Sequence, residues 1–510
     1  MELRLGVRVH ATGARADVVV RARDGASLAE VEADLLARVL PPDGTGCLSV
    51  AGTRVASTTL LGAEPLVQGV LLEVDAPAVR RTPAERELRV VGGPHAGQVH
   101  PLPLGELHLG RSADCDVRLD DPSTSRAHCR LSTGPEGVQV HDLGSANGTS
   151  VDGVEVGPTG LLLRTGAVLR VGASRLTVAV PSAADLPVQP TGDGRLVVNR
   201  VPRLRPEPAV VRVVVPTEPA ERERGPVPVL AVLAPLVLGV VMWRVTGSTT
   251  FLLFTLLSPV LVIGAVVTER RTGSRRGRRD RALWVAQRAV AEQVLADAVR
   301  ADEVARRAAW PDAAELRQTA LGPGPRLWER DRRDPDLLDV RLGLADLPAG
   351  VEAEGDVTTA TTTARDVPVV VPLATVGVLG LAGAGVRGLG RWVLLQTAVL
   401  HSPRDLQVVV LAEPAAAPGW EWVRWLPHTR PDADQDCRSL VGFDGVQAGA
   451  RVTELLSLVD ARRAARPVPV RAHRPVLLVV DGADPARRAR LRPPAGRGPG
   501  ARGARRLPRG

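Results

Sequence analysis

The sequence contains no lysine and no tyrosine, and it has only three phenylalanines among its 510 residues. All 65 basic residues are therefore arginine. Alanine, arginine, glycine, proline and valine are all encoded by codons rich in G and C, so this bias indicates a very GC-rich genome, such as that of an actinobacterium. The absence of lysine excludes every site whose chemistry depends on that residue.

Patterns that bind metals or form disulfides are also missing from the sequence. The four cysteines, Cys47, Cys115, Cys129 and Cys437, are scattered and form no CxxC pair, which fits a reducing compartment better than a disulfide framework. The nine histidines show no metal-ligand spacing, so we expect no metal and no cofactor. Met1–His10 alternates like a strand, and no signal peptide is predicted.

The net charge of +9 is not spread evenly along the chain. Much of the excess lies in residues 270–281 and 487–509. A basic protein can meet nucleic acid or anionic lipid. Because the excess is local, we do not expect nucleic acid to be a partner.

Residues 1–80 follow the order strand, strand, helix and strand. Leu3, Leu5 and Val7 alternate with other residues, and Ser27 begins a capping box with Glu30 ahead of a helical pattern. This order predicts a ubiquitin-like β-grasp domain with a packing or interaction role.

Residues 88–180 contain many short strand patterns separated by turn residues such as Asn147-Gly148 and Asp152-Gly153. Regular turns between short strands predict an all-β sandwich. Residues 181–225, which are rich in proline and charge, are predicted to be a linker.

Two uncharged apolar stretches follow, Pro226–Trp243 and Thr249–Val267. Each is close to the ~20 residues that cross a bilayer, so we expect a transmembrane helical hairpin at 226–267. Core helices of a soluble domain are the alternative. The arginines after Glu269 mark a cytoplasmic flank. The expected protein is therefore multi-pass in the cell membrane, with both termini cytoplasmic.

The remaining sequence predicts three further parts. Residues 270–320 read as a basic juxtamembrane segment and a helical stalk. Residues 326–484 show a mixed α/β pattern, with solid apolar runs typical of buried parallel strands. The tail 485–510 mixes arginine with proline and glycine, and we expect it to be disordered. A shifted reading frame explains the tail better than a nucleic-acid or lipid-binding role, but the sequence leaves both open.

Short motifs within 88–180 occur in the order found in FHA (forkhead-associated) domains, which this segment resembles. They are Gly110-Arg111, Ser125-x-x-His128 and Asn147-Gly148-Thr149. The resemblance implies a phosphothreonine-peptide site. It implies Arg111, Ser125 and Asn147 as ligand contacts, Arg126 as a second cation, and Gly110, His128 and Gly148 as supports of the loops.

The chemistry of these side chains suits a phosphate dianion. Guanidinium and hydroxyl groups form short, charge-assisted hydrogen bonds with phosphate oxygens. Two alternatives stay open. One is a sandwich whose turns merely need these residues, and the other is an FHA fold that has lost peptide binding.

The order of the parts resembles the N-terminal portion of the FtsK/SpoIIIE-type ATPases of type VII secretion, the EssC/EccC family. The matching stretches are Asn199–Arg203, Leu327–Arg330, Leu342-Gly343, His401–Leu406 and Trp420–His428. The resemblance implies that 326–484 is a degenerate ATPase-like domain. In the nearest candidate P-loop, Gly380–Arg387, Val386 stands where lysine is needed. We therefore expect no ATPase activity and no catalytic residue.

The predicted protein is a membrane-anchored phosphothreonine-peptide-binding protein, the N-terminal portion of a type VII secretion translocase without its active motor domains. The expected partners are a Thr-phosphorylated protein or a Ser/Thr kinase, the membrane, and type VII secretion components. Homo-oligomerisation stays open. The alternatives are a nucleotide-dependent motor that moves DNA or protein, and a stand-alone FHA signalling adaptor.

Overall fold

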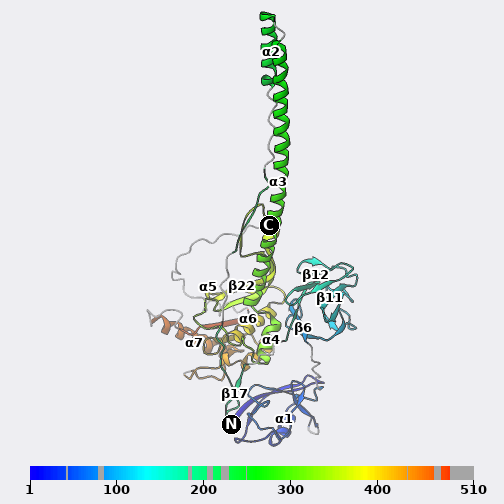
Figure 1. Ribbon diagram of the computed structural model, residues 1–510. Helices are drawn as coiled ribbons and strands as arrows, with labels where there is room; N and C mark the ends of the chain where they lie inside the picture. The colour runs from blue at the N-terminus through cyan, green and yellow to red at the C-terminus, as the bar shows by residue number, and fades with distance from the viewer. Residues whose placement is uncertain are drawn as a thin grey trace. The chain divides into compact units, whose positions relative to one another are not determined.

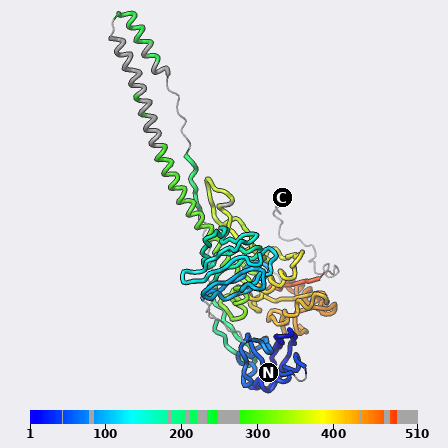
Figure 2. The backbone as a smooth tube through the Cα atoms, turned by 90° about the vertical axis from the view of Figure 1, so that its right-hand side faces the viewer, coloured from blue at the N-terminus to red at the C-terminus, as the bar shows by residue number. Residues whose placement is uncertain are grey.

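The computed structural model describes residues 1–41, 44–77, 85–181, 186–203, 211–219, 229–247, 250–433, 435–464 and 473–482. The chain divides into two compact units, which can be followed in Figures 1 and 2. The first unit comprises Met1–Arg205, Trp310–Gly343 and Pro368–Gly510, and the second comprises Pro206–Ala309 and Leu344–Val367. The predicted tail 485–510 lies outside the described residues.

The first unit begins with a five-stranded mixed sheet in the order β2-β1-β5-β3-β4. β1 runs antiparallel to β2 and parallel to β5. Leu3, Leu5 and Val7 are fully buried, as their alternation predicts. The backbone N–H of Ser27 donates to Glu30 Oε1 over 3.0 Å, which completes the capping box. The elements are β1 (Glu2–Val9), β2 (Arg15–Arg21), η1 (Leu28–Glu30), α1 (Glu32–Leu36), β3 (Leu48–Val50), β4 (Thr53–Arg54) and β5 (Leu71–Val74).

The next eleven strands form two facing sheets, in the orders β14-β11-β10-β8-β9 and β13-β12-β15-β16-β6-β7. Their inward side chains make one apolar core that includes Leu109, Leu131, Leu169 and Leu176. The predicted all-β sandwich is confirmed. The strands are β6 (Arg86–Gly92), β7 (Val99–Leu102), β8 (Gly105–Gly110), β9 (Val117–Arg118), β10 (Cys129–Gly134), β11 (Gly137–Asp142), β12 (Thr149–Val151), β13 (Val154–Glu155), β14 (Leu161–Leu163), β15 (Val168–Val171) and β16 (Ser174–Ala179).

A short antiparallel hairpin lies within the segment predicted to be a linker. It consists of β17 (Val188–Pro190) and β18 (Leu196–Val198). Its turn is closed because Thr191 N–H donates to the Arg195 carbonyl over 2.8 Å. Part of the predicted linker is therefore regular structure, and the sequence missed it because the proline and charge content hides three-residue strands.

The rest of the first unit is built on a parallel three-stranded sheet in the order β24-β23-β25. All six residues of β23 are buried, which agrees with the solid apolar run in the sequence. The elements are α4 (Ala313–Leu321), α5 (Leu373–Val376), α6 (Val386–Leu400), β23 (Gln407–Ala412), η3 (Ala417–Gly419), η4 (Glu421–Trp425), η5 (Pro427–Thr429), β24 (Val441–Gly442), α7 (Gly445–Ala464) and β25 (Val476–Asp481).

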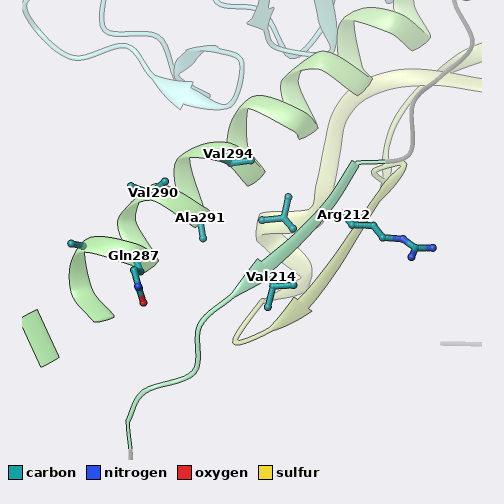
Figure 3. Close-up of a pocket in the computed structure, with 8 residues that line it drawn as sticks. Arg212, Val214, Gln287, Val290, Ala291 and Val294 are labelled. Atoms are coloured by element: carbon teal, nitrogen blue, oxygen red, sulfur yellow. The ribbon is translucent and has the colours of Figure 1, made fainter. Parts of the chain in front are cut away.

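The second unit pairs β19 in parallel with β21 against α3. Its small core joins Val213 and Val215 to Leu295 and Val299. An open apolar groove runs between β19 and α3, where Val214, Val290 and Val294 lie at its walls (Figure 3). The elements are β19 (Val211–Val215), α2 (Val229–Thr246), α3 (Thr250–Ala309), β21 (Val351–Gly355) and η2 (Thr359–Thr362). Two further strands, β20 (Asp339–Pro348) and β22 (Thr363–Pro372), pair with each other, and each has residues in both units.

The structure corrects the predicted transmembrane hairpin at 226–267. Among the residues that the structure describes, no helix combines the length and the apolar character needed to cross a membrane. α2 has 18 residues, fewer than the ~20 of a spanning helix, and carries Arg244 in its last turn. α3 continues without a break from its apolar start into arginine-rich sequence. Residues 220–228 and 248–249 lie outside the described residues.

This correction extends to the predicted localisation. The predictions of two transmembrane helices and of a multi-pass membrane protein with both termini cytoplasmic are wrong. Uncharged runs of 18 and 19 residues suggested separate spans, but the structure joins the second run to the charged stalk in one helix of 60 residues.

Candidate functional site

Two loops at one end of the sandwich are joined by backbone hydrogen bonds. The N–H of Arg111 donates to the Ser125 carbonyl over 2.9 Å, and the N–H of Ser112 donates to the Arg126 carbonyl over 3.0 Å. Arg111 follows directly after β8, whereas Ser125 and Arg126 precede β10. The pairing therefore brings three of the four predicted ligand contacts to adjacent positions.

Gly110 is required by the close approach of these loops. A Cβ atom at this position would lie 2.1 Å from the Arg126 carbonyl oxygen and 2.9 Å from Cys115 Sγ. No side chain fits at that separation unless the backbone moves. The glycine of the Gly-Arg motif therefore allows the contact that sets Arg111 beside Arg126.

His128 ties the loop before β10 to the loop between β11 and β12. Its side chain is completely buried. The Ser125 N–H donates to His128 Nδ1 over 3.1 Å, so Nδ1 is unprotonated and Nε2 carries the hydrogen. Nε2 then donates to the Gly148 carbonyl over 3.2 Å. In this tautomer a neutral His128 forms a hydrogen bond with each of the two loops. Gly148 allows the turn after Asn147 because it adopts a φ of 70°.

Ser125 and Asn147 make further bonds between the same loops. The Ala146 N–H donates to Ser125 Oγ over 3.1 Å, and Asn147 Nδ2 donates to the Ser123 carbonyl over 2.8 Å. Each side chain keeps capacity for a ligand. The Ser125 hydroxyl still has its hydrogen to donate, and Asn147 keeps its carbonyl oxygen and a second amide hydrogen.

Arg111 and Arg126 are both exposed. In the part of the chain that the structure describes, neither guanidinium has a hydrogen-bond or ion-pair partner. Unpaired guanidinium groups on adjacent loops make a site for an anion, and their planar donors match the oxygens of a phosphate. The geometry is compatible with the predicted roles of all seven motif residues, which stay predictions as contacts to a ligand.

Two aspartates with no role predicted from the sequence take their hydrogen bonds from hydroxyl and backbone N–H groups rather than from these arginines. Asp121 is 1% exposed and accepts from Ser123 Oγ over 2.6 Å, from the Ala173 N–H over 2.8 Å and from Ser174 Oγ over 3.0 Å. Burial raises the pKa of Asp121, but these hydrogen bonds outweigh it and lower the pKa to about 2.

Asp142 plays the matching role in the loop between β11 and β12. It accepts from the N–H groups of Gly144 and Ser145, each over 2.9 Å, and from the Ser145 hydroxyl over 2.6 Å. Burial raises the pKa of Asp142, but the hydrogen bonds lower it overall. A serine two or three residues after each aspartate was the available sequence signal, because such residues bond to the local backbone.

The glycine-rich loop of the region predicted to be ATPase-like has a different electrostatic arrangement. α6 begins directly after Gly385, which has a φ of 74°. Arg387 Nε lies 3.0 Å from Asp481 Oδ2, and Trp420 Nε1 donates to the same oxygen over 2.8 Å. In a P-loop a hydroxyl at the position of Arg387 and an aspartate after a buried strand hold Mg²⁺. Here an internal cation already neutralises that carboxylate.

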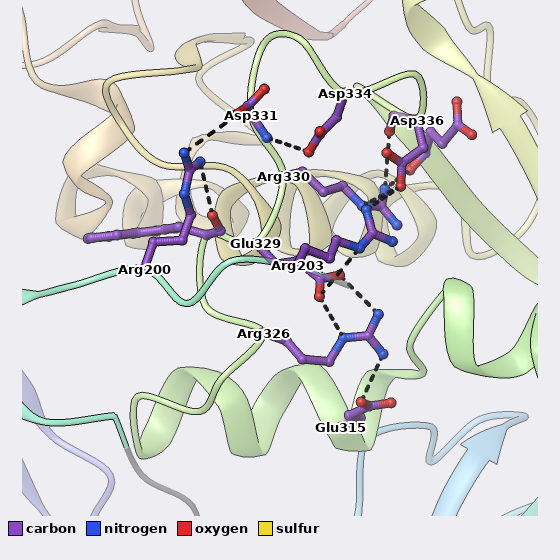
Figure 4. A network of polar contacts seen from close by, with 11 residues as sticks. Arg200, Arg203, Glu315, Arg326, Glu329, Arg330, Asp331, Asp334 and Asp336 are labelled. Carbon is purple, nitrogen blue, oxygen red and sulfur yellow. Dashed lines mark hydrogen bonds and ion pairs between the residues drawn. The ribbon is translucent and has the colours of Figure 1, made fainter. Parts of the chain in front are cut away.

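A partly buried ionic network joins two of the matching stretches, Asn199–Arg203 and Leu327–Arg330 (Figure 4). Arg203 bonds to Asp336 over 2.6 Å. Arg326 bonds to both oxygens of Glu329, over 3.1 and 2.9 Å. Arg330 is fully buried and bonds to the Asp339 carbonyl over 2.8 Å. The network fixes the segment after β18 to residues 326–339.

Two more of the matching stretches, His401–Leu406 and Trp420–His428, meet in a pair of buried histidines. His428 Nε2 lies 2.7 Å from the His401 carbonyl, and His401 Nδ1 lies 2.9 Å from the Thr397 carbonyl. Burial lowers the pKa of His401 and of His428 to about 4 each. Both histidines are therefore neutral at pH 7, and their role in the described chain is structural.

Residues 89–182 match the family model described as the inner membrane component of T3SS, cytoplasmic domain. The matched range coincides with the β-sandwich and includes all the loops described above.

The chain also resembles curated secretion proteins. The ESX-4 secretion system protein EccC4 of Mycobacterium tuberculosis is 29% identical over 263 residues, which are 44% of this chain and 21% of that protein. The ESX-3 secretion system protein EccC3 of the same species is 31% identical over 224 residues, covering 38% and 16%. The ESX secretion system protein EccC of Thermomonospora curvata is 29% identical over 193 residues, covering 34% and 14%. The matches thus span about a fifth or less of each relative.

Solved structures of FHA domains resemble the sandwich. One, from a structural and functional analysis of phosphothreonine-dependent FHA domain interactions, is 29% identical and covers 19% of this chain and 97% of that one, with a TM-score of 0.18. The FHA domain of the CT664 protein from Chlamydia trachomatis is 26% identical and covers 19% and 98%, with a TM-score of 0.18. The predicted resemblance to FHA proteins and to the N-terminal part of EccC is confirmed.

Proposed function

We propose that the loops around Arg111 bind a phosphothreonine peptide, and that the chain serves a type VII secretion translocase as its N-terminal, non-hydrolysing portion. The names of the ESX relatives support the link to secretion. The proposed partners are a Thr-phosphorylated protein or a Ser/Thr kinase, together with components of the secretion system.

One observation carries the binding proposal. Arg111 and Arg126 stand exposed on hydrogen-bonded loops and have no partner among the described residues, while Asp121 and Asp142 accept from serine hydroxyls. A phosphate dianion would meet two cations and the Ser125 hydroxyl. The free amide groups of Asn147 would meet the main chain of the peptide.

The test is a phosphothreonine-peptide library screened against the full chain. Arg111→Ala removes a charge-assisted contact of about 1.5–3 kcal/mol. We expect the best peptide to bind roughly 10- to 150-fold more weakly to this variant, since 1.4 kcal/mol is about tenfold in affinity.

Arg170→Ala is the matched control, because Arg170 is an exposed arginine on β15 of the same sandwich. It loses the same charge but should keep the affinity of the original chain. Equal weakening by both variants would mean that net charge, not a defined site, attracts the peptide. Equal affinity of Arg111→Ala and the original chain would refute the site.

The proposal that the chain does not hydrolyse ATP is supported by Val386 at the lysine position and by the pairing of Arg387 with Asp481. Nucleotide binding and turnover by the full chain test this directly. Tight binding with turnover would instead favour a nucleotide-dependent motor. A stand-alone signalling adaptor would bind phosphothreonine peptides but would not bind components of the secretion system.

A further inference from the structure

The end of the connection between β21 and β22, together with the first residue of β22, is rich in threonine. Thr358, Thr359, Thr361, Thr362 and Thr363 occupy five of six consecutive positions, and η2 lies within them. Thr358, Thr359 and Thr361 are exposed. The segment 357–364 has no charged residue. Neither the proposed secretion role nor the proposed peptide binding involves this segment.

The hydroxyl groups of the five threonines are not equivalent. Thr361 Oγ1 donates to the Thr358 carbonyl over 2.8 Å, and Thr363 Oγ1 donates to the Thr359 carbonyl over 2.6 Å. Thr362 Oγ1 has a weaker bond of 3.3 Å to the same Thr359 carbonyl. Thr358 Oγ1 lies 3.4 Å from Thr361 Oγ1. In the described chain, the Thr359 hydroxyl alone of the five makes no hydrogen bond.

An exposed hydroxyl without a protein partner is the one that modifying chemistry reaches most easily. Phosphorylation of Thr361 or Thr363 would break a bond that holds the turn, whereas phosphorylation of Thr359 breaks none. Phosphate would add a charge of about −1.5 to −2 to a segment that is otherwise uncharged.

We propose that Thr359 is phosphorylated and that the phosphorylated connection is a ligand of the Arg111 loops of this same protein. This inference rests on the proposed peptide binding. A Ser/Thr kinase would supply the phosphoryl group from a nucleoside triphosphate. The Thr359 Oγ1–phosphorus bond forms, the bond between the γ-phosphorus and the β,γ-bridging oxygen breaks, the hydroxyl proton goes to the base of the kinase, and the nucleoside diphosphate leaves.

Charge makes the interaction depend on phosphorylation. The guanidinium groups of Arg111 and Arg126 have no partner in the described chain, and the unmodified threonine segment offers them no anion. The dianion at Thr359 would supply one. The chain would then carry both the reader of a phosphothreonine and the threonine that is read.

Binding of synthetic peptides to the full chain tests the assignment. Three versions of residues 353–365 are compared: phosphorylated at Thr359, phosphorylated at Thr361, and unmodified. We expect the Thr359 phosphopeptide to bind about tenfold or more tightly than the other two. Arg111→Ala should abolish this advantage, and Arg170→Ala should preserve it.

The outcomes separate this inference from the binding proposal on which it rests. If the best library phosphopeptide binds but the Thr359 phosphopeptide binds no better than the unmodified one, the inference is overturned and the binding proposal stands. If no phosphothreonine peptide binds, both fail. Equal binding of the Thr359 and Thr361 phosphopeptides would overturn the choice of Thr359.

The full chain with phosphothreonine installed at position 359 identifies the source of the ligand. Occupied loops should bind the library peptide about tenfold more weakly than those of the unmodified chain. Self-association that is lost on introducing Arg111→Ala assigns the ligand to a second copy, whereas a monomer with blocked loops assigns it to the same chain. Unchanged peptide binding by a monomer would overturn the inference.

Discussion

The loop after β8 and the loop before α6 each contain a glycine and an arginine, but the arginine is left unpaired in the first and is ion-paired in the second. After β8, Gly110 lets the backbones approach, and Arg111 stays exposed without a partner in the described chain. Before α6, Gly385 turns the chain, and Arg387 bonds to Asp481. The difference lies in the donors of the acids, since Asp121 and Asp142 are bonded to serines and backbone N–H groups whereas Asp481 accepts from the arginine. An arginine is free for a phosphate only where the neighbouring carboxylates have other donors.

Acid should separate the two regions most strongly. The unfolded chain protonates histidine near 6.5, whereas His401 and His428 protonate near 4 in the folded chain. Between these values the unfolded state binds more protons, so the free energy of unfolding decreases as the pH falls from 6.5 to 4, by roughly 3 kcal/mol for each histidine. Hydrogen exchange, corrected for its intrinsic pH dependence, should show β23 losing protection as the pH falls through this window.

The sandwich should lose less protection over the same range, where burial also lowers the pKa of His100 on β7. Asp121 has a pKa of about 2 when folded and 3.8 as the ordinary value, so its contribution is lost only below that range. Exchange at β10 and β11 provides the internal control. Loss of protection at these strands before β23 would contradict the assignment of acid sensitivity to the two histidines.

The next largest effect is expected from removing the side chain of Arg111. Arg111→Ala should weaken phosphothreonine-peptide binding by about 1.5–3 kcal/mol with little change in stability, because the side chain is exposed and unpaired in the described chain. Fluorescence anisotropy and denaturant unfolding of the same preparations measure both. A large stability loss with normal binding would reverse the comparison.

Gly110→Ala tests the close approach of the loops. The added methyl group would meet the Arg126 carbonyl, and we expect about 1–3 kcal/mol of destabilisation together with weaker peptide binding. Urea unfolding monitored at the sandwich gives the stability change. Gly134→Ala is the control, because a Cβ at Gly134 meets nothing within 4 Å, and similar losses from both variants would show that the contact is unimportant.

Arg387→Ala should have the smallest effect. The Arg387 side chain is 57% exposed, so its pair with Asp481 is worth only about 0.2–1 kcal/mol. Phosphothreonine-peptide binding should not change. Isothermal calorimetry with Mg²⁺–ATP is the sharper measurement. If the variant binds nucleotide no better than the original chain, the missing lysine rather than the ion pair is the main block.

Local motifs made the sandwich and its loops predictable. The spacing of Gly110, Arg111, Ser125, His128 and Asn147 placed the candidate site on three loops, and the backbone bonds bring those loops together. The transmembrane prediction failed because apolar length alone does not say how the helix continues. The hairpin β17–β18 was missed because its strands of three residues are too short for periodicity to register.

The sequence by itself determined which side chains are available to bind phosphate. It also determined that the glycine-rich loop lacks the lysine of a P-loop, because both features depend on residues close together along the chain. Only the tertiary structure decided which charges meet. Arg387 and Asp481 are 94 residues apart, and Asp121 accepts from Ser174 across 53. A hydrogen bond or ion pair needs contact at about 3 Å, and separation along the sequence says nothing about that contact until the sheets have formed.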